Sequence, residues 1–233
     1  MVALLITVSA FLALFALWRF FWFFRDPDRT PPPGDGILAP ADGFVVYAHR
    51  VERGEIPVAL KKRRTIPLDE LTSLPGLAGA SGLQIGIFMT AFNVHVTRAP
   101  IAGVVRERIH TPRTRNRTMA RMFANILLAR RPIADDSAHL VENERVTTVI
   151  EGERGIVAVT QIADAWASWV VCNVSPGDHI ERGARFGMIR MGSQVDLFIP
   201  DSPTSRAEPV CAVGQQIRAG ESVVALTTNY GAS

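Results

Sequence analysis

The sequence opens on 24 residues with a single charge, Arg19, in the run MVALLITVSAFLALFALWRFFWFF. As a helix this run is about 36 Å long, which is enough to cross a bilayer. Trp18, Arg19, Trp22 and the following Arg25 stand at its carboxyl end, whereas a cleaved secretory signal carries its positive charge before the apolar residues. The pattern predicts a retained membrane anchor over residues 1–24.

The same residues predict the orientation of the anchor. Tryptophan and arginine prefer the headgroup layer, and basic residues stay on the cytoplasmic side of a membrane. We therefore expect the amino terminus outside and the rest of the chain at the cytoplasmic face of the cell membrane. A helix that lies in the interface without crossing it is the alternative.

Residues 25–36, RDPDRTPPPGDG, interrupt the hydrophobic pattern with four prolines. Proline fixes φ and disfavours helix at the preceding residue, so this stretch predicts a stiff, extended linker. The folded domain is expected to cover residues 37–233.

Short apolar runs rich in β-branched residues follow, each broken by Gly, Pro or Asp. They are residues 44–51, 83–89, 102–109, 145–152, 155–163, 166–174, 186–191, 194–200, 209–213 and 222–226. Long helices do not alternate with these runs, so the pattern favours a mainly β domain, a barrel-like β sandwich, over a layered α/β fold. In the run 194–200, alternation predicts that Val195, Leu197 and Ile199 share one face.

A weak internal repeat lies in the carboxyl-terminal half. PGDHIERGARFG and VGQQIRAGESVV both place an isoleucine three residues after a glycine and a second glycine six residues after it. Gly177, Ile180 and Gly183 thus match the set Gly214, Ile217 and Gly220. Glycine-bracketed turns of this kind recur in the small barrels of lipoyl and biotinyl carrier domains, so we expect carrier-like elements here.

Composition excludes several classes of site. The hydrophobic content of 48% in 233 residues is enough for a core. Cys172 and Cys211 are far apart and lack metal-ligand spacing, so we predict neither a disulfide framework nor a metal. Lys61 and Lys62 are the only lysines and lie together in the run KKRR, so no secluded lysine is available for pyridoxal phosphate.

The formal net charge is +3. Positive charge is clustered in residues 113–131, which contain six arginines and no acidic residue. Apolar residues stand between these arginines, a combination that suits an anionic membrane surface. An ordinary solvated helix or loop is an equally good interpretation. A nucleic acid would meet the same charge pattern, but we predict no nucleic-acid partner.

Three stretches carry chemistry-bearing side chains: APADGFV with Asp42, FMTAFNVHVTRAP with His95, and RMGSQVDL with Ser193. Singly, each has a structural explanation, as a turn aspartate, a core histidine and a turn serine. Spacing alone does not establish a Ser-His-Asp set, because most chains of this size contain all three residue types.

In combination, these motifs resemble the short form of phosphatidylserine decarboxylase. APADG after a proline-rich linker, FNVHVTRAP, ENER at 142–145 and GSQVDLFIP occur in that family's order. The resemblance covers essentially the whole domain. It implies a proenzyme that cuts itself between Gly192 and Ser193 into a long chain, 1–192, and a short chain, 193–233.

The resemblance also implies the roles of the residues. Ser193 attacks the Gly192 carbonyl and becomes a pyruvoyl group that forms an imine with the substrate; His95 is the base, and Asp42 orients it and stabilises the imidazolium. The cofactor is thus the pyruvoyl group, without pyridoxal phosphate or metal. The two fragments are expected to stay associated as a heterodimer by strand pairing, and further homo-oligomerisation is compatible with the sequence.

The substrate implied by the resemblance and the anchor is a membrane phospholipid with a serine headgroup. For its phosphodiester we name Arg98 first, then Arg115 or Arg117. Longer family members carry a second histidine where this chain has Phe92, so the proton donor after decarboxylation is not assigned. The other histidines, including His139, have no motif support and are expected at surface or turn positions.

Two alternatives stay open on the sequence. One is a non-catalytic, membrane-anchored β-barrel adaptor in which Gly192 and Ser193 form only a turn. The other keeps the chemistry and changes the lipid to an archaeal-type ether lipid that bears serine.

Overall fold

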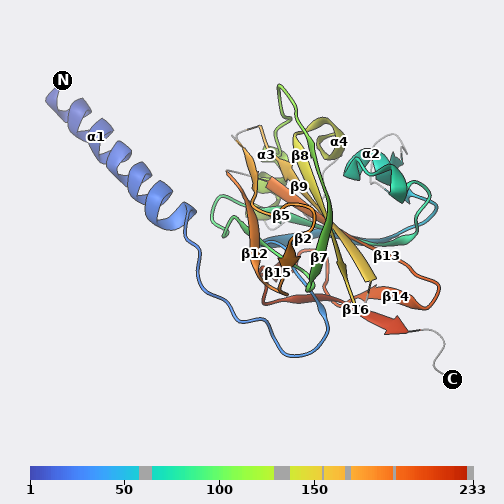
Figure 1. The fold of residues 1–233 in the computed structure, drawn as a ribbon. Coiled ribbons are helices and arrows are strands. Elements are labelled where there is room, and N and C mark those ends of the chain that lie inside the picture. Colours follow the sequence, from blue (N-terminus) through green and yellow to red (C-terminus); the bar gives the residue numbers. More distant parts are fainter. Residues whose placement is uncertain (58–64, 129–136, 154, 166–168, 191–192, 230–233) are drawn as a thin grey trace.

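The computed structural model describes residues 1–57, 65–128, 137–153, 155–165, 169–190 and 193–229. Sixteen strands and a few short helices form its domain, and a long apolar helix projects from it (Figure 1). The prediction of a mainly β domain behind an apolar amino-terminal helix is confirmed. Lys61, Lys62 and Gly192 lie outside the described residues.

The amino-terminal helix consists of α1 (Val2–Leu17) and its π-helical continuation η1 (Trp18–Phe23). Its 22 residues have a mean hydropathy of 2.1, so it is long and apolar enough to cross a membrane. Leucine and phenylalanine side chains are exposed around it, and an all-round apolar helix needs an apolar environment. Phe23, at its end, is fully buried in the domain.

An eight-stranded antiparallel sheet, curled into a half-barrel, is the centre of the domain (Figure 1). In spatial order its strands are β11 (His179–Ile180), β7 (Gly103–Thr111), β8 (Arg145–Gly152), β9 (Gly155–Ala163), β13 (Ser193–Pro200), β5 (Gly82–Met89), β2 (Gly43–Val51) and β15 (Gln216–Ile217). β13 therefore lies in the middle, paired along its length with β5 and β9.

Two three-stranded sheets and a small ribbon complete the β structure. One sheet has the order β1 (Ile37–Leu38), β16 (Val223–Asn229), β14 (Ser205–Pro209), and the other β10 (Val170–Cys172), β12 (Arg185–Ile189), β6 (Val96–Arg98). The ribbon pairs β3 (Glu55–Ile56) with β4 (Ile66–Pro67). Domain helices are α2 (Leu68–Thr72), η2 (Pro75–Leu77), α3 (Ala120–Leu127) and α4 (His139–Glu142).

The large sheet separates two apolar cores. The first lies between this sheet and the two three-stranded sheets and contains Val195, Leu197 and Ile199, as their alternation predicts. The second lies on the other face, under α2, α3 and α4, and contains Phe198. β13 is thus buried on both faces, which fits its place in the centre of the sheet.

The basic stretch contributes to the second core. Met119 and Met122 are buried there, and Phe123 and Ile126 pack against it. These apolar side chains of α3 therefore face the protein, while the arginine side of the helix faces solvent.

The internal repeat corresponds to a repeated structure. Gly177, Gly183, Gly214 and Gly220 all have positive φ, between +72° and +97°. Between each pair of turns lies a two-residue strand, β11 or β15, and these strands form the two opposite edges of the large sheet. The likeness of these elements to those of lipoyl and biotinyl carrier domains stays a prediction.

The repeat extends to the strands beside it, where APADG at 39–43 matches APIAG at 99–103. Gly214 N–H donates to the Val45 carbonyl and Gly177 N–H to the Val105 carbonyl, each at 2.8 Å. We call residues 35–45 with 214–229 the Asp42 unit, and residues 95–105 with 177–189 the His95 unit. The two units also bond to each other reciprocally, Leu38 N–H to the Pro100 carbonyl and Arg98 N–H to the Pro40 carbonyl.

The predicted strand at 209–213 is wrong. β14 ends at Pro209, and the following residues turn toward β15, with Ala212 N–H donating to Gln215 Oε1 at 2.9 Å. Val210 and Val213 are each half exposed, so their apolar character does not reflect a buried strand.

The proline-rich segment after the anchor carries no helix or strand over residues 25–36 and lies against the domain. Arg182 donates to the carbonyls of Pro32 and Gly36, and Arg98 donates to the carbonyl of Pro27. Gly183 packs so closely on Pro31 that a Cβ there would lie 2.5 Å from the ring. These contacts hold the segment in place between the anchor and β1.

Candidate active site

Ser193 is the first residue of β13, with Met89 of β5 and Ala163 of β9 as its cross-strand partners. Its side chain is fully buried, and Oγ donates to the Met89 sulfur at 3.1 Å. A thioether is a weak acceptor, so the hydroxyl is held without a strong hydrogen bond. Gly192, the other side of the predicted cut, is outside the described residues.

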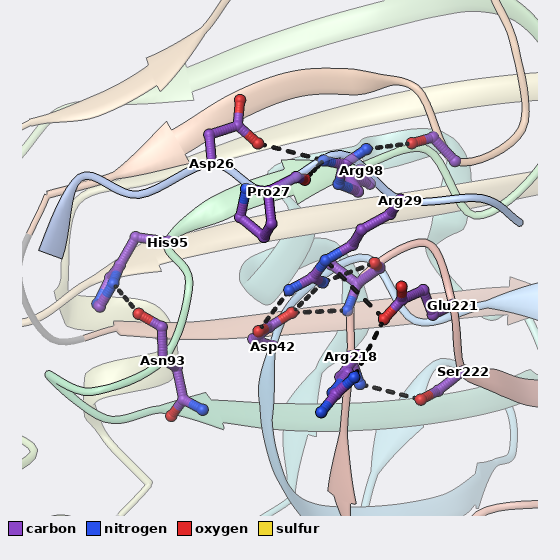
Figure 2. Close-up of polar contacts among 12 residues, drawn as sticks. Asp26, Pro27, Arg29, Asp42, Asn93, His95, Arg98, Arg218, Glu221 and Ser222 are labelled. Carbon is purple, nitrogen blue, oxygen red and sulfur yellow. Dashed lines mark hydrogen bonds and ion pairs between the residues drawn. The ribbon is translucent and has the colours of Figure 1, made fainter. Parts of the chain in front are cut away.

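His95 lies in the loop between β5 and β6 and is fully buried. Its Nδ1 is 3.0 Å from the carbonyl oxygen of Asn93 (Figure 2). A carbonyl only accepts, so Nδ1 carries the proton and Nε2 keeps its lone pair. Within the described part of the chain, the buried Nε2 has no hydrogen-bond partner. This is the tautomer that a general base needs.

The loop that presents Asn93 is fixed by its own side chain. Thr90 donates to Asn93 Oδ1 twice, from its backbone N–H at 2.8 Å and from its hydroxyl at 2.7 Å. Asn93 N–H donates back to the Thr90 carbonyl at 3.1 Å, so these bonds close a four-residue turn. It orients the Asn93 carbonyl toward His95 and so determines the tautomer of the imidazole.

The surroundings of His95 keep it neutral. Burial lowers its pKa to about 4, the bond to Asn93 and the charge of Asp42 oppose that shift, and the charges of Arg25 and Arg19 add to it. Burial disfavours the charged imidazolium because it removes hydration. His95 is therefore unprotonated at neutral pH.

His95 is also close in the fold to the chain that leads to Ser193. Ile189 N–H, at the end of β12, donates to the His95 carbonyl at 3.2 Å. Val96 pairs with Met188 in the same ladder. The structure thus brings the histidine beside the end of β12, four residues before the serine.

Asp42 is buried just before β2 and accepts hydrogen bonds from Arg29 and Ala219 (Figure 2). Arg29 donates to both carboxylate oxygens, and Ala219 N–H donates to Oδ1 at 2.8 Å. Among the described residues, the hydrogen-bond partner of His95 Nδ1 is the Asn93 carbonyl and not Asp42. Asp42 acts on His95 through its charge, which favours the imidazolium.

The end of the apolar helix reaches this site. The Phe23 ring packs in a tilted arrangement on the His95 ring, with centroids 4.2 Å apart and an interplanar angle of 32°. Arg25 donates to the Phe92 carbonyl at 2.6 Å, three residues before His95. The aromatic cover contributes to the burial of the imidazole, and sequence patterns gave no sign of it because the two residues are 72 positions apart.

Of the arginines named from the sequence, Arg98 is nearly fully buried and bonded to the protein. It donates to Gly183 and Pro27 carbonyls and pairs with Asp26 at 3.2 Å (Figure 2). Its Nη donors therefore join residues 25–36, the proline-rich segment, to Gly183 of the domain, and its role as a phosphate ligand stays a prediction.

Arg115 and Arg117 are exposed on the segment between β7 and α3. The Arg117 guanidinium pairs with Glu142. Its backbone is held by Asn143, whose side-chain amide also donates to the carbonyl of Ala163 at 2.7 Å. Asn143 thus ties this segment to the strand partner of Ser193, which gives the ENER motif a structural role.

A buried polar network lies on the opposite face of β13 from Ser193. Asp196 accepts from Tyr47, Gln84 and Gln194, and burial raises its pKa to about 6. His139, expected at the surface, is buried instead, with Nε2 3.1 Å from Gln194 Oε1. The surface expectation for His139 was wrong because α4 packs it onto the sheet.

Comparison with known proteins identifies the family of the chain. Residues 16–225 match the family model described as phosphatidylserine decarboxylase. The phosphatidylserine decarboxylase proenzyme of Pelobacter propionicus is 37% identical over 218 residues, covering 92% of this chain and 80% of the relative. The proenzyme of Nitratidesulfovibrio vulgaris is 36% identical over 227 residues, covering 97% and 85%, and that of Geobacter sulfurreducens 32% over 226 residues, covering 96% and 81%. The chain therefore belongs to the phosphatidylserine decarboxylase family.

Proposed function

We propose that this chain is a membrane-anchored proenzyme that cuts itself between Gly192 and Ser193 and then converts phosphatidylserine to phosphatidylethanolamine and CO2. The observation that carries the proposal is His95, which is neutral, buried and held by Asn93 with an unpaired Nε2. Its place beside the end of β12 and the family's proenzyme relatives support the same assignment.

In the cleavage, His95 Nε2 takes the hydroxyl proton of Ser193 while Oγ attacks the Gly192 carbonyl carbon. The Gly192–Ser193 C–N bond breaks, the amine of Ser193 takes the proton from His95, and an ester remains. Loss of the Cα proton of Ser193 then expels Gly192 as a carboxylate. The unsaturated residue takes up water and releases ammonia, which leaves a pyruvoyl group at the new amino terminus.

The charge of Asp42 contributes to this step because it favours the imidazolium that forms on His95. Two functions were expected of Asp42, to orient His95 and to stabilise its imidazolium. In this proposal the Asn93 carbonyl orients His95, and the charge of Asp42 stabilises the imidazolium. Arg29 holds Asp42 in place, and a bidentate pair of this kind fixes both direction and distance.

The residues around Ser193 fit a pyruvoyl group. The start of β13 is fully buried, the Ser193 hydroxyl makes only a weak contact, and His95 Nε2 has no partner within the described residues. When formed, the group supplies a carbonyl that reacts with the substrate amine and accepts the electron pair released with CO2. The chain's own residues exclude water from this carbonyl and supply a base at His95.

Both products of the cut are expected to remain together. The short chain, 193–233, begins with β13, which is hydrogen-bonded on one side to β5 and on the other to β9. Separation would break both ladders and expose the two cores. Further homo-oligomerisation stays a prediction.

The anchor supports a lipid substrate, because Phe23 at the end of the apolar helix contacts His95 directly. We place the domain on the cytoplasmic side, in line with the arginines at that end of the helix. An ether lipid that bears serine would present the same headgroup, and a comparison of diacyl and diether substrates separates the two.

The test is the mass and activity of the purified full-length chain and of Ser193→Ala. The wild type should give two fragments, the shorter one blocked to amino-terminal sequencing, and should release CO2 from phosphatidylserine labelled in the serine carboxyl. Ser193→Ala should remain a single chain without activity. Borohydride added with the lipid should trap it on the short fragment.

An intact wild-type chain in active membranes would exclude self-processing. A single chain without activity, together with normal membrane insertion, would favour the adaptor function. His95→Gln should slow the cut by about a hundredfold or more, since general-base groups contribute roughly 10²- to 10⁴-fold. His179→Gln, at an exposed position on β11, is the matched control and should cut normally.

A further inference from the structure

Two arginines at the membrane side of the site share one aromatic ring. The Arg19 guanidinium carbon, on η1, lies 4.1 Å from the Phe24 ring centroid and 4.9 Å from that of Phe23. The Arg190 guanidinium carbon, just beyond β12, lies 6.0 Å from the Phe24 centroid and 5.7 Å from that of Trp169. The aromatic rings therefore support two positive charges at one place.

Neither guanidinium has an acid partner among the described residues. Arg19 Nη1 and Arg190 Nε are buried without a hydrogen-bond partner in the described part of the chain, and the charge of Arg190 acts on Arg19. The neighbouring arginines differ, because Arg29 pairs with Asp42 and Arg98 with Asp26. Two like charges side by side, with buried donors unused, are costly unless an anion binds between them.

The position of the pair relates it to the chemistry. Arg190 follows Ile189, whose N–H bonds the His95 carbonyl, and precedes Gly192 by two residues. Arg19 acts electrostatically on His95 and lies where the apolar helix meets the domain. Arginine at the end of a membrane helix lies at the depth of the lipid headgroups.

We propose that Arg19 and Arg190 bind the phosphodiester of the lipid substrate and so hold its headgroup beside Ser193. This inference rests on the proposed function. Two guanidinium groups present several donors in planar forks that match the oxygens of a phosphate. A phosphodiester also lies at headgroup depth, where Arg19 is placed by the helix. Arg98 donates from Nη2 to Asp26 and Pro27 and from Nη1 to Gly183, so it is then the residue that fixes the proline-rich segment on the domain.

The kinetic test compares Arg19→Gln and Arg190→Gln with Arg206→Gln, an arginine on β14 that pairs with Glu208. Either substitution at the pair should raise KM for phosphatidylserine by about 10- to 100-fold, as expected for a lost charge-assisted contact. The variants should still cut into two fragments, and Arg190→Lys should recover part of the loss. An unchanged KM, or an equal rise in Arg206→Gln, would overturn the inference.

A binding test is independent of activity. Ser193→Ala protein in a phosphate-free detergent should broaden the ³¹P signal of glycerophosphoserine, and adding Arg190→Gln to that chain should abolish the broadening. Inorganic phosphate is the second probe, and broadening as strong as that of glycerophosphoserine would contradict a site for the lipid headgroup. If glycerophosphoserine binds while the wild type neither cuts nor decarboxylates, the proposed function fails and the anion site stands.

Discussion

The Asp42 unit and the His95 unit share one backbone and differ in the residues they supply to the site. The alignment of APADG with APIAG places Asp42 opposite Ala102, and the same offset places His95 opposite Asp35. Asp42 and His95 are buried, whereas Ala102 and Asp35 are exposed. Each unit therefore contributes one candidate catalytic side chain, and the equivalent position of the other unit faces solvent.

This difference shows what the repeated scaffold provides. Turns, edge strands and the reciprocal hydrogen bonds between the units position two backbones symmetrically. The segments that break the symmetry act on the two candidate catalytic side chains. The proline-rich segment bonds Asp42 through Arg29, and the end of the apolar helix covers His95 with Phe23. The apolar amino-terminal helix and the segment after it thus cover two side chains that the units alone leave without these partners.

The largest loss of stability is expected at Asp42, whose equivalent in the other unit is Ala102. Asp42→Ala leaves the Arg29 side chain, 5% exposed, with Glu221 at 4.0 Å in place of a bidentate partner, and should lower the free energy of unfolding by about 3 kcal/mol. Self-cleavage should be lost at the same time. Thermal unfolding in detergent and a denaturing gel measure the two effects.

The matched control is Ala102→Asp, which adds a carboxylate at the exposed equivalent position and should change the stability by less than about 0.5 kcal/mol. Combining Asp42→Ala with Arg29→Met also removes the buried guanidinium of Arg29. This double variant should recover stability without recovering the cut. Normal cleavage in that double variant would contradict a role for the charge of Asp42.

The next largest effect is expected from acid, which protonates His95 and lowers the free energy of unfolding. The pKa of His95 is about 4 in the folded chain against 6.5 in the unfolded one, so between these values the unfolded state binds more protons. Stability is therefore full above pH 6.5 and falls as the pH drops toward 4, by about 3 kcal/mol from this group. The cleavage rate should be constant at neutral pH and fall below about pH 4, where the imidazolium forms.

Unfolding of uncut Ser193→Ala protein at several pH values measures this stability term. His95→Gln should remove it, and His179→Gln, in the same unit, should leave it unchanged. A cleavage rate that falls already between pH 7 and pH 6 would mean that His95 titrates in its ordinary range and is less well covered than its contact with Phe23 implies.

The glycines that begin β2 and β7 test the equivalence of the units directly. A Cβ on Gly43 would lie 2.2 Å from the Phe88 carbonyl oxygen, and one on Gly103 would lie 2.2 Å from that of Glu151. Gly43→Ala and Gly103→Ala should each cost about 2 to 3 kcal/mol, because the adjacent strand must move. Gly76→Ala, with open space around it, is the control, and unequal losses at the two glycines would break the proposed symmetry.

The smallest effect is expected at the outer turns. Gly177 and Gly214 have φ of +97° and +86° with open space around them, so only backbone strain opposes a side chain. Each substitution by alanine should cost about 1 kcal/mol, and the two costs should be equal. Thermal unfolding of both variants decides whether the two turns carry the same strain.

The parts of the fold that sequence predicted are those with local patterns. The runs at 145–152 and 155–163 became β8 and β9 with the same bounds, because consecutive β-branched residues favour strands wherever they lie. The helix at the amino terminus followed from hydropathy alone. Val210 and Val213 gave a false strand, since a few apolar residues in a turn resemble a short one.

The site was predictable only where the resemblance supplied motifs, at Ser193, His95 and Asp42. The tautomer of His95 depends on a backbone carbonyl, which leaves no trace in residue type. The contacts of Phe23, Arg29 and Arg190 join segments far apart in the chain, and spacing carries no information about them. Asp42 was expected to orient His95, and its hydrogen bonds go to Arg29 and Ala219 instead.

The central place of β13 has a consequence for the lifetime of such an enzyme. A dissociable coenzyme can be lost, damaged and exchanged, but a reactive terminus at the head of a strand paired on both sides cannot be replaced without unfolding the molecule. Each chain that cuts itself before Ser193 therefore makes its reactive group once. On the proposed self-cleavage, a side reaction at this terminus inactivates the whole molecule permanently. The amount of active enzyme then depends on the rate of new protein synthesis and not on the supply of a vitamin.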